Sequence, residues 1–485
     1  MKIMLTTLNS KYVHMNLAIR YLYEAAIEFK DQIMIKEFTI NNDDDYIFTE
    51  LVLCEAELIC FSCYIWNIER ILSLAANLKK AKPELRIVLG GPEVSYDQEA
   101  FLQKHPYIDL VIQGEGELAF HQLCNDFLTM GALPKAYLTR PMEDFEIPFP
   151  YGHLTPEKDK TVYYESSRGC PYRCAYCLSS IQGRIRGLPV DRVKGELLYF
   201  LSEKVRQVKF VDRTFNWNDE RCCDIIKFLM ENDNGVTNFH FEMCGELISD
   251  RLIQLLEKAR VGQFQLEIGI QSTHAKTLEA VNRTGKIEAI RTNVEKIKRP
   301  GNVHIHLDLI VGLPHEGFDT FKTSFNQVYE LAPDALQVGF LKMLKGTLMR
   351  EMGPSHGYLY REKAPYEVVA SKYMTGLEMA RLKQFEKVVD LYYNKGGFSR
   401  SLQVLLAEKE GVPFDFYEAL ALYYHQKGHQ HKSHKKEDLY RILLGYAEAA
   451  GQVTEEMKAL LLLDMKDMLN AEAVKNFERK GFNAL

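Results

Sequence analysis

The sequence of 485 residues lacks any apolar run of the roughly 18–20 residues that a membrane-spanning helix needs. It also lacks a basic excess, because 60 Lys and Arg stand against 66 Asp and Glu, for a net charge of −6. This balance does not favour a nucleic-acid partner, although a local basic patch stays open. The amino terminus runs directly into a strand-like stretch and lacks the regions of a signal peptide. We therefore expect a cytoplasmic protein without a membrane segment.

Cysteine is absent from residues 245–485, because all ten thiols lie at or before Cys244. Without a secretory leader, such thiols are typical of reduced residues and metal or cluster ligands rather than disulfides. Cys170, Cys174 and Cys177 form a C-x3-C-x2-C spacing, with Tyr176 directly before the last thiol. Three thiolates on one loop can hold three irons of a [4Fe–4S] cluster and leave the fourth iron open. A structural zinc site is the alternative, but it usually takes four paired ligands, and no second pair lies nearby.

The other cysteines offer weaker signals. Cys60 and Cys63 form a C-x-x-C that could be a redox pair, but at the end of an apolar strand they are typical of small buried hydrophobes. Adjacent Cys222 and Cys223 fall in a predicted helix, where they face different directions. Cys244 follows Glu242 by two residues, and a role as hydrogen donor in the cavity stays open.

The stretch from Arg168 to Cys177 resembles the cluster loop of radical S-adenosylmethionine (SAM) enzymes. The resemblance implies that the amino and carboxylate groups of SAM bind the open iron of a [4Fe–4S] cluster. It also implies that one electron, from a donor such as flavodoxin or ferredoxin, splits the sulfonium bond and releases a 5′-deoxyadenosyl radical. In such enzymes the cofactor does the difficult chemistry, and the protein supplies orientation and protection.

Residues 1–135 alternate short β-rich stretches with amphipathic helical patterns such as Leu17–Phe29 and Ile68–Lys79. The predicted strands are Lys2–Leu8, Ile33–Phe38, Glu57–Ser62, Arg86–Leu89 and Asp109–Gln113. This alternation predicts an α/β domain with a doubly wound, Rossmann-like parallel sheet. Ligands bind such sheets beyond the carboxyl ends of the strands, where the strand order reverses.

Two glycine-rich loops at these ends, Gly90-Gly91-Pro92 and Gly114-Glu115-Gly116-Glu117, resemble those of the cobalamin-binding domain that precedes many radical SAM domains. The resemblance implies a set of corrin contacts, which comprises Ser10, Lys11, Tyr12, His14, Ser62, Tyr64, Gly90, Gly91, Glu93, Val94, Gly114, Glu115 and Gly116. The D-x-H-x-x-G string that would supply a histidine ligand is missing, so we expect cobalamin without a histidine beneath cobalt. A domain that has lost its cofactor, with His14 as an ordinary loop residue, is the alternative.

Residues 136–160 are predicted to be a linker, because prolines oppose helix and central strand. The prolines and acids in or just before this stretch are Pro134, Pro141, Pro148, Pro150, Pro156, Glu143, Asp144 and Glu146. Residues 161–350 then predict six strands: Thr161–Ser166, Gln207–Asp212, Asn238–Met243, Gln263–Gln271, Val303–Ile310 and Ala335–Lys342. Predicted helices between them include Asp191–Leu201, Asp219–Glu231, Asp250–Lys258 and Thr320–Leu331. Six such units predict a partial (β/α)6, TIM-like barrel, with its chemistry at the carboxyl ends of the strands.

The strings Glu267–Ser272 and Asp308–Pro314 resemble the fourth- and fifth-strand motifs of radical SAM enzymes. The resemblance implies SAM contacts at Tyr176, Glu242, Glu267, Gln271 and Gly312. Asp212 and Asp308 are then candidates for catalytic contact with substrate or a proton donor. Because an unpaired buried carboxylate is costly, a structural ion pair with Arg213, Lys209 or another barrel residue is the alternative for the predicted SAM contacts on the strands.

Residues 351–485 predict a helical domain, with helices at Tyr366–Asp390, Gly397–Glu408, Phe414–Gln426, Lys436–Ala450 and Thr454–Leu469. The string Tyr392–Gly397 resembles a C-terminal domain of unassigned role that accompanies this group of enzymes, and we expect it to cap the barrel. A cationic run comprises His425, Lys427, His429, His431, Lys432, His434, Lys435 and Lys436. A metal site and a phosphate or RNA contact stay open for this run, with a solvated loop as the default.

Together these resemblances predict a cobalamin-dependent radical SAM methyltransferase that acts on an unreactive carbon or phosphorus centre of an unknown substrate. A rearrangement, cyclisation or reduction without methyl transfer is the first alternative. A non-catalytic cobalamin sensor with a structural cluster is the second.

Overall fold

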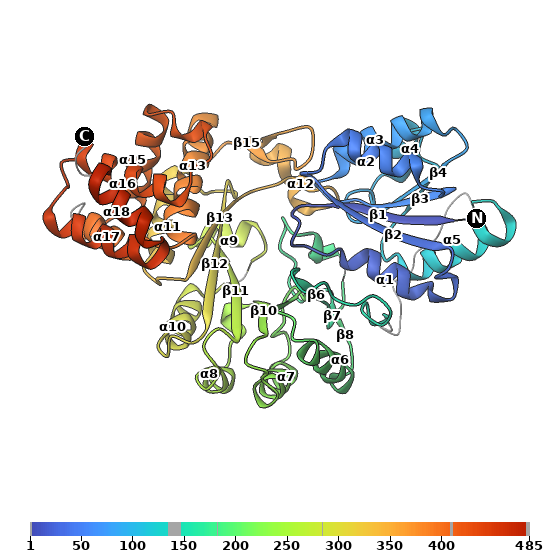
Figure 1. Cartoon of the computed structure of the whole chain (residues 1–485), viewed down its shortest axis with the longest axis horizontal. Coiled ribbons are helices and arrows are strands. Elements are labelled where there is room, and N and C mark those ends of the chain that lie inside the picture. The colour runs from blue at the N-terminus through green and yellow to red at the C-terminus, as the bar shows by residue number, and fades with distance from the viewer. Residues whose placement is uncertain (1, 134–146, 182, 284, 408–410, 482–485) are drawn as a thin grey trace. The chain divides into compact units, whose positions relative to one another are not determined.

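The computed structural model describes residues 2–133, 147–181, 183–283, 285–407 and 411–481. The chain divides into two compact units (Figure 1). The first unit contains residues 1–265, 342–351 and 361–367, and the second contains residues 266–341, 352–360 and 368–485. Two short segments from beyond residue 340 therefore belong to the same unit as the amino-terminal sheet.

The amino-terminal sheet is parallel and doubly wound, as predicted. Its order is β2-β1-β3-β4-β5, so the strand order reverses between β1 and β3. The strands are β1 (Ile3–Asn9), β2 (Ile33–Thr39), β3 (Leu58–Ser62), β4 (Arg86–Gly90) and β5 (Leu110–Ile112). The helical elements are α1 (Leu17–Ala25), η1 (Ile27–Phe29), α2 (Asp44–Leu53), α3 (Ile68–Ala81), α4 (Gln98–Lys104) and α5 (Glu117–Met130).

Helices cover both faces of this sheet, and successive strand residues point to opposite faces. In β3, Ile59 and Phe61 pack in one core with residues of α2 and α3, whereas Leu58 and Cys60 pack in another with residues of α1 and α5. Figure 1 shows α1 and α5 on one side of the strands and α2 and α3 on the other. Because both faces are apolar and covered, polar contacts with a ligand have room only at the carboxyl edge.

The described part of the connector, from residue 147, is packed against the first unit. The Tyr151 hydroxyl donates to the Tyr163 carbonyl at 2.7 Å, and Arg20 donates to the Leu154 carbonyl at 2.9 Å. Glu24 accepts from the backbone and ring of His153 at 2.7 and 2.9 Å. The remaining predicted linker residues Pro134, Pro141, Glu143, Asp144 and Glu146 lie outside the described residues.

A second sheet of six strands has the order β13-β12-β11-β10-β9-β6, which is the sequential order expected of a partial barrel. The strands are β6 (Val162–Tyr164), β9 (Gln207–Phe210), β10 (Asn238–Met243), β11 (Phe264–Gln271), β12 (His304–Val311) and β13 (Ala335–Phe340). The helical elements between them are η2 (Leu178–Ile181), α6 (Val190–Ser202), α7 (Asp219–Glu231), η3 (Gly245–Leu247), α8 (Asp250–Leu256), α9 (Ala275–Ala280), α10 (Ile287–Lys298) and α11 (Phe318–Tyr329). A small antiparallel pair, β7 (Ser167–Arg168) and β8 (Arg186–Gly187), flanks the cysteine loop and was not predicted.

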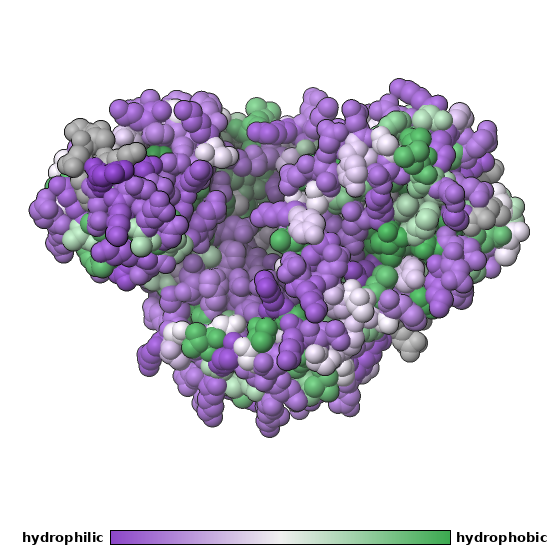
Figure 2. Space-filling model, viewed as in Figure 1, coloured by the Kyte–Doolittle hydropathy of each residue, from purple (hydrophilic) through white to green (hydrophobic). Residues whose placement is uncertain are grey.

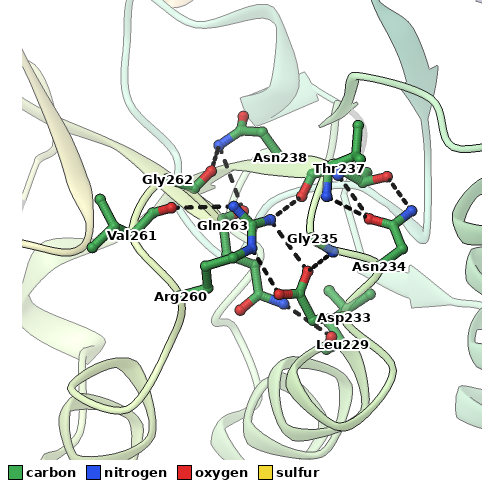
Figure 3. A network of polar contacts seen from close by, with 11 residues as sticks. Leu229, Asp233, Asn234, Gly235, Thr237, Asn238, Arg260, Val261, Gly262 and Gln263 are labelled. Carbon is green, nitrogen blue, oxygen red and sulfur yellow. Dashed lines mark hydrogen bonds and ion pairs between the residues drawn. The ribbon is translucent and has the colours of Figure 1, made fainter.

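The loops that precede β10 and β11 are joined by a polar network (Figure 3). Arg260 pairs with Asp233 at 2.7 Å and donates to the Thr237 carbonyl at 3.1 Å. Burial opposes ionisation of Asp233, but the hydrogen bonds from Arg260 and Gly235 outweigh it and lower its pKa. The network lies at the amino ends of the strands, opposite to the edge where barrel enzymes place their chemistry, so we assign it to stability.

The carboxyl-terminal part of the second unit is helical. It contains α13 (Gly376–Val389), η5 (Asp390–Asn394), α14 (Ser399–Ala407), α15 (Pro413–Gln426), η6 (His429–His431), α16 (Lys436–Ala449), α17 (Glu455–Met468) and α18 (Ala471–Gly481). Before these helices lie α12 (Leu348–Met352), η4 (Gly353–His356), β14 (Leu359–Tyr360) and β15 (Val368–Ala370).

One predicted helix begins too early. The periodicity predicted a helix from Tyr366, but Val368–Ala370 form a strand and the helix begins at Gly376. The structural reason is a capping box, in which Thr375 accepts from the Glu378 backbone while the Glu378 side chain accepts from Thr375. The last helix, α18, was not predicted.

Among the described residues, no helix is both long and apolar enough to cross a membrane. Hydrophilic residues cover most of the face seen in Figure 2, and apolar residues form small separate groups on it.

Candidate functional site

The carboxyl edge of the amino-terminal sheet exposes apolar side chains where the strand order reverses. Tyr12 and Val13 follow β1 and are 70% and 42% exposed, and Trp66, after β3, is 43% exposed. The Tyr64 and Trp66 rings stack with centroids 4.4 Å apart and 5° between their planes. Exposed apolar groups at a switch point are typical of a binding site for a large, flat ligand, and this fits the predicted corrin.

Trp66 is a candidate contact that the sequence analysis missed. Its indole Nε1 donates to the Leu8 carbonyl at 3.1 Å, which fixes the ring against the end of β1. The sequence feature that could have indicated it is its position two residues after Tyr64, which was a predicted corrin contact.

Gly91 allows the turn after β4 to pass close to β3. Its φ is +105°, and an added Cβ would lie 2.6 Å from the Cys63 carbonyl oxygen. No larger residue fits without movement of the backbone. Gly114, with φ +75°, likewise turns the chain after β5, where Ser95 Oγ accepts from its backbone N–H at 3.2 Å.

Glu93 is placed differently from the other predicted corrin contacts. It is 3% exposed, and its carboxylate pairs with Lys345 at 2.7 Å and accepts from the Tyr366 hydroxyl. The carboxylate therefore joins the β4 loop to the two later segments of the first unit. Val94 and Ser62 are also buried, whereas Ser10 and Lys11 are partly or largely exposed.

His14 contacts residues at the start of the barrel. Its Nδ1 lies 2.7 Å from the Tyr163 hydroxyl, and residue 14 forms a backbone bridge with Thr161. Burial, and then Lys11 and Lys209, lower the pKa of this imidazole. These contacts give His14 a structural task, and the absence of a histidine ligand beneath cobalt stays a prediction.

The cluster loop follows β7. Cys174 is buried, whereas Cys170 and Cys177 are partly exposed, and none of the three forms a disulfide. The Cys174 carbonyl accepts from Cys177 N–H at 3.1 Å, and the Cys177 carbonyl accepts from Ser180 Oγ at 2.6 Å. Gly169 opens the loop with φ +96°, and an added Cβ would lie 2.8 Å from the Arg184 carbonyl oxygen. A loop with three thiols outside any disulfide, one buried and two partly exposed, fits a cluster with one open iron.

Two residues of β9's carboxyl end support this loop. Asp212 is 1% exposed and accepts from Ser166 N–H and Ser166 Oγ, both at 2.7 Å, and from Ser167 Oγ. Burial raises the pKa of Asp212, while the Ser167 and Ser166 hydrogen bonds act against that shift. Thr214 Oγ1 lies 3.5 Å from Cys170 Sγ. The Asp212 carboxylate, which was predicted to be catalytic, therefore holds the two serines that precede the cysteine loop. Its catalytic role stays a prediction.

Other cysteines behave as the sequence suggested. Cys60, Cys63 and Cys222 are buried thiols without disulfides, and burial raises the pKa of each. Cys244 Sγ lies 3.0 Å from the hydroxyl of Tyr172, a residue of the cluster loop. Cys244 thus borders the predicted cluster site.

The inner face of the barrel strands carries the second group of predicted residues. Along β12 burial alternates, so that Leu307 and Leu309 are fully buried while His306 and Asp308 are only partly buried. Glu267 on β11 joins them, and one ligand atom from each of Glu267, His306 and Asp308 lies within 4.8 Å of the others. Two carboxylates and an imidazole can bind a cation or hold a proton. Glu267 was a predicted SAM contact and Asp308 a predicted catalytic residue, whereas His306 was not predicted.

Strained backbone marks the carboxyl ends of β11 and β12. Gln271 has φ +73° and His315 has φ +63°, which is costly for residues other than glycine and is typical of functional sites. The Gln271 amide oxygen is buried and has no hydrogen-bond partner among the described residues. Such a group fits a polar ligand, as predicted for SAM. Glu242 and Tyr176, in the first unit, are partly buried.

Glu316, in the loop after β12, connects this loop to the loop after β11 and to α11 through hydrogen bonds. It is 0% exposed and accepts from Ser272 Oγ at 2.6 Å and from Ser324 Oγ at 2.9 Å. Burial raises its pKa to about 7. Gly312, with φ +90°, lies between the strand and this loop, and its carbonyl accepts from the Tyr358 hydroxyl at 2.8 Å. Glu316 follows Gly312 by four residues and was not recognised from the sequence.

The histidine run of the carboxyl-terminal helices has no metal-binding geometry among the described residues. The Gln430 amide lies 3.2 Å from His425 Nδ1 and 3.1 Å from His431 Nε2, and His434 Nε2 lies 2.7 Å from the His429 carbonyl. These local contacts agree with the solvated-loop interpretation.

Three family models match consecutive parts of the chain. A B12 binding domain matches residues 3–124, the radical SAM superfamily matches residues 164–328, and a protein family of unknown function (DUF4080) matches residues 354–483. The predicted order of a cobalamin domain, a radical SAM domain and a helical domain of unassigned role is therefore confirmed.

Relatives with assigned names are distant. The chain is 24% identical over 434 residues to the cobalamin-dependent radical SAM methyltransferase TokK of Streptomyces tokunonensis, which covers 77% of this chain and 62% of the relative. It is also 24% identical over 426 residues to the 2-(S-pantetheinyl)-carbapenam-3-carboxylate methyltransferase of Streptantibioticus cattleyicolor, with the same coverage. The chain thus spans less than two thirds of these relatives.

Solved structures share the fold. The cobalamin-dependent SAM radical enzyme OxsB with aqua-cobalamin bound has a TM-score of 0.62 at 13% identity, covering 99% of this chain and 84% of that chain. The radical SAM methyltransferase TsrM from Kitasatospora setae, with cobalamin and a [4Fe–4S] cluster bound, has a TM-score of 0.60 at 12% identity, covering 76% and 79%. The predicted fold class is confirmed.

Replacement of Cys170, Cys174 or Cys177 by Ala is expected to abolish the visible iron–sulfur absorbance after anaerobic reconstitution, because one iron loses its protein ligand. Iron and sulfide content measure the same loss. Cys54→Ala is the matched control, since this partly buried thiol lies at the end of α2 and donates to the Leu51 carbonyl. Full cluster content in any of the three variants would contradict the assignment.

Glu316→Gln is expected to change how stability depends on pH. A carboxyl whose folded pKa is raised to about 7 binds more protons in the folded than in the unfolded state, so its burial becomes destabilising as pH rises from about 4.5 to 7. The glutamine oxygen can still accept the two serine hydrogen bonds but cannot ionise. Thermal unfolding at pH 5 and pH 8 should show the variant gaining relative stability at the higher pH. The exposed Glu456→Gln serves as control, and parallel profiles for wild type and Glu316→Gln would refute the assignment.

Proposed function

We propose that this chain, a radical SAM protein with an amino-terminal B12 binding domain, is a cobalamin-dependent methyltransferase. The observation that carries the proposal is the presence, within one unit, of a three-thiol loop and an exposed aromatic switch point. The names of its relatives support methyl transfer over the other radical reactions. When bound, the cluster, SAM and cobalamin would together supply a 5′-deoxyadenosyl radical and a transferable methyl group.

The chain's own residues would hold and protect these groups. Cys170, Cys174 and Cys177 would ligate iron, and the buried Cys174 limits access of solvent to one corner. Tyr64 and Trp66 would lie against the corrin. Gln271 would offer its amide oxygen to a donor of SAM, and His306 with Asp308 would orient or exchange a proton with the substrate.

We further place the enzyme in the cytoplasm with an electron donor such as flavodoxin or ferredoxin. None of the ten cysteines, all of which the structure describes, forms a disulfide, which suits a reducing compartment. The substrate class stays open.

The function is tested by anaerobic turnover with reduced flavodoxin as electron donor and SAM that carries a deuterated methyl group, using small molecules from a cell extract as substrate source. We expect 5′-deoxyadenosine, S-adenosylhomocysteine and a labelled product, all absent with Cys174→Ala. Formation of 5′-deoxyadenosine without S-adenosylhomocysteine or label would instead indicate a rearrangement, cyclisation or reduction. Absence of SAM cleavage in the fully reconstituted protein would indicate a non-catalytic role.

His14→Ala is expected to leave the electron paramagnetic resonance spectrum of bound cob(II)alamin unchanged, without nitrogen hyperfine splitting from a histidine in either protein. The reason is that His14 is held by Tyr163 and the bridge to Thr161. Splitting that is present in wild type and disappears in His14→Ala would show that His14 is the lower ligand.

A further inference from the structure

The first unit contains a buried ion network that lies between the loop after β5 and the cluster loop. Arg186 is bidentate to Glu115, with one of its two hydrogen bonds at 3.2 Å. Arg168 pairs with Glu165 at 2.9 Å, with Glu115 at 3.5 Å and with Glu117. The five side chains are between 7% and 19% exposed. We name them the arginine clamp.

Each end of the clamp is next to a predicted cofactor contact. Arg168 and Arg186 are paired across β7 and β8, and Cys170 follows Arg168 by two residues. Glu115 lies between Gly114 and Gly116, and Glu117 begins α5. Glu115 and Glu117 pair with the two arginines beside the cluster loop. In the loop after β5, the backbone of the neighbouring glycines is therefore the part that remains to face a corrin.

Stability alone is a poor explanation for such a network. Burying five ionisable groups carries a large desolvation penalty, and an apolar cluster of similar size would often be as stable. What planar, bidentate arginine–carboxylate pairs add is fixed geometry. The clamp makes the position of one loop depend on the position of the other.

We infer that Arg168 and Arg186 are positioning residues that couple cobalamin binding to the state of the cluster loop. The inference rests on the proposed function, which supplies both ligands. A bound cluster fixes the conformation of residues 168–177. Through the ion pairs of the arginine clamp, this also fixes the conformation of residues 114–117, so that cobalamin binds a loop that is already ordered. Because coupling between sites is reciprocal, bound cobalamin also stabilises the loaded cluster loop.

The test is a titration of full-length protein with hydroxocobalamin, followed by absorbance, with the cluster loaded and with the cluster absent. We expect wild type to bind about 10-fold more tightly when the cluster is loaded, within the usual range of such couplings. Arg186→Gln should bring this ratio close to 1. Arg186 is chosen for substitution rather than Arg168, because Arg168 pairs with three carboxylates and its replacement would remove a partner from all three.

Arg192→Gln is the matched control, because Arg192 on α6 pairs with Glu196 at 2.8 Å and donates to the Ile147 carbonyl, and neither partner belongs to the two loops. It should keep the wild-type ratio. If Arg186→Gln does not fold, Arg186→Lys replaces it, since lysine keeps the charge but not the bidentate geometry. In cofactor-free protein, hydrogen exchange at residues 113–117 should be faster in the Arg186 variant than in the Arg192 variant.

The outcomes separate the inference from the function on which it rests. Cobalamin that binds wild type equally with and without the cluster overturns the inference, as does an Arg186 variant that folds and keeps the full ratio. If wild type binds no cobalamin in either state, the proposed function itself fails. A variant that only unfolds at lower temperature, with ratio and exchange unchanged, shows a merely structural clamp and also overturns the inference.

Discussion

Burial of both faces of a parallel sheet is the constraint from which the placement of the candidate site follows. In β3 the alternating residues enter two separate apolar cores, so no face of the sheet is free for a polar ligand. The carboxyl edge is what remains, and the glycine turns and the aromatic pair Tyr64–Trp66 lie there. On β12, by contrast, partly buried His306 and Asp308 alternate with fully buried leucines, so one side of this strand is less covered than the other.

Local patterns were sufficient for most of the framework. The strand Asn238–Met243 and the helix Asp219–Glu231 were predicted to the residue, because each has a clear period and flanking breakers. The cysteine spacing likewise needs no tertiary information. The helix predicted from Tyr366 was wrong at its start, since apolar periodicity alone cannot reveal where a capping box such as Thr375–Glu378 begins a helix.

Partners that are distant in sequence were beyond such patterns. Glu93 looked like a loop residue beside a ligand, but Lys345, 252 positions later, pairs with it. Asp212 looked like a catalytic acid at a strand end, but Ser166 and Ser167 occupy its carboxylate. The hydrogen bonds of Glu316 were equally beyond reach, because its partners Ser272 and Ser324 lie 44 and 8 positions away in the sequence. An ionisable residue can be found from the sequence, but whether it is paired depends on the fold.

The pairing of Glu93 also bears on how the chain can be divided. A fragment that ends near residue 133 would retain all five strands of the first sheet yet omit both Lys345 and Tyr366. Its Glu93 would then lose both of these partners together with the segments that contact it, so the environment of its carboxylate would differ from the 3% exposed site of the full chain. Residues 342–351 and 361–367 therefore complete the surroundings of this sheet, although its family model ends at residue 124.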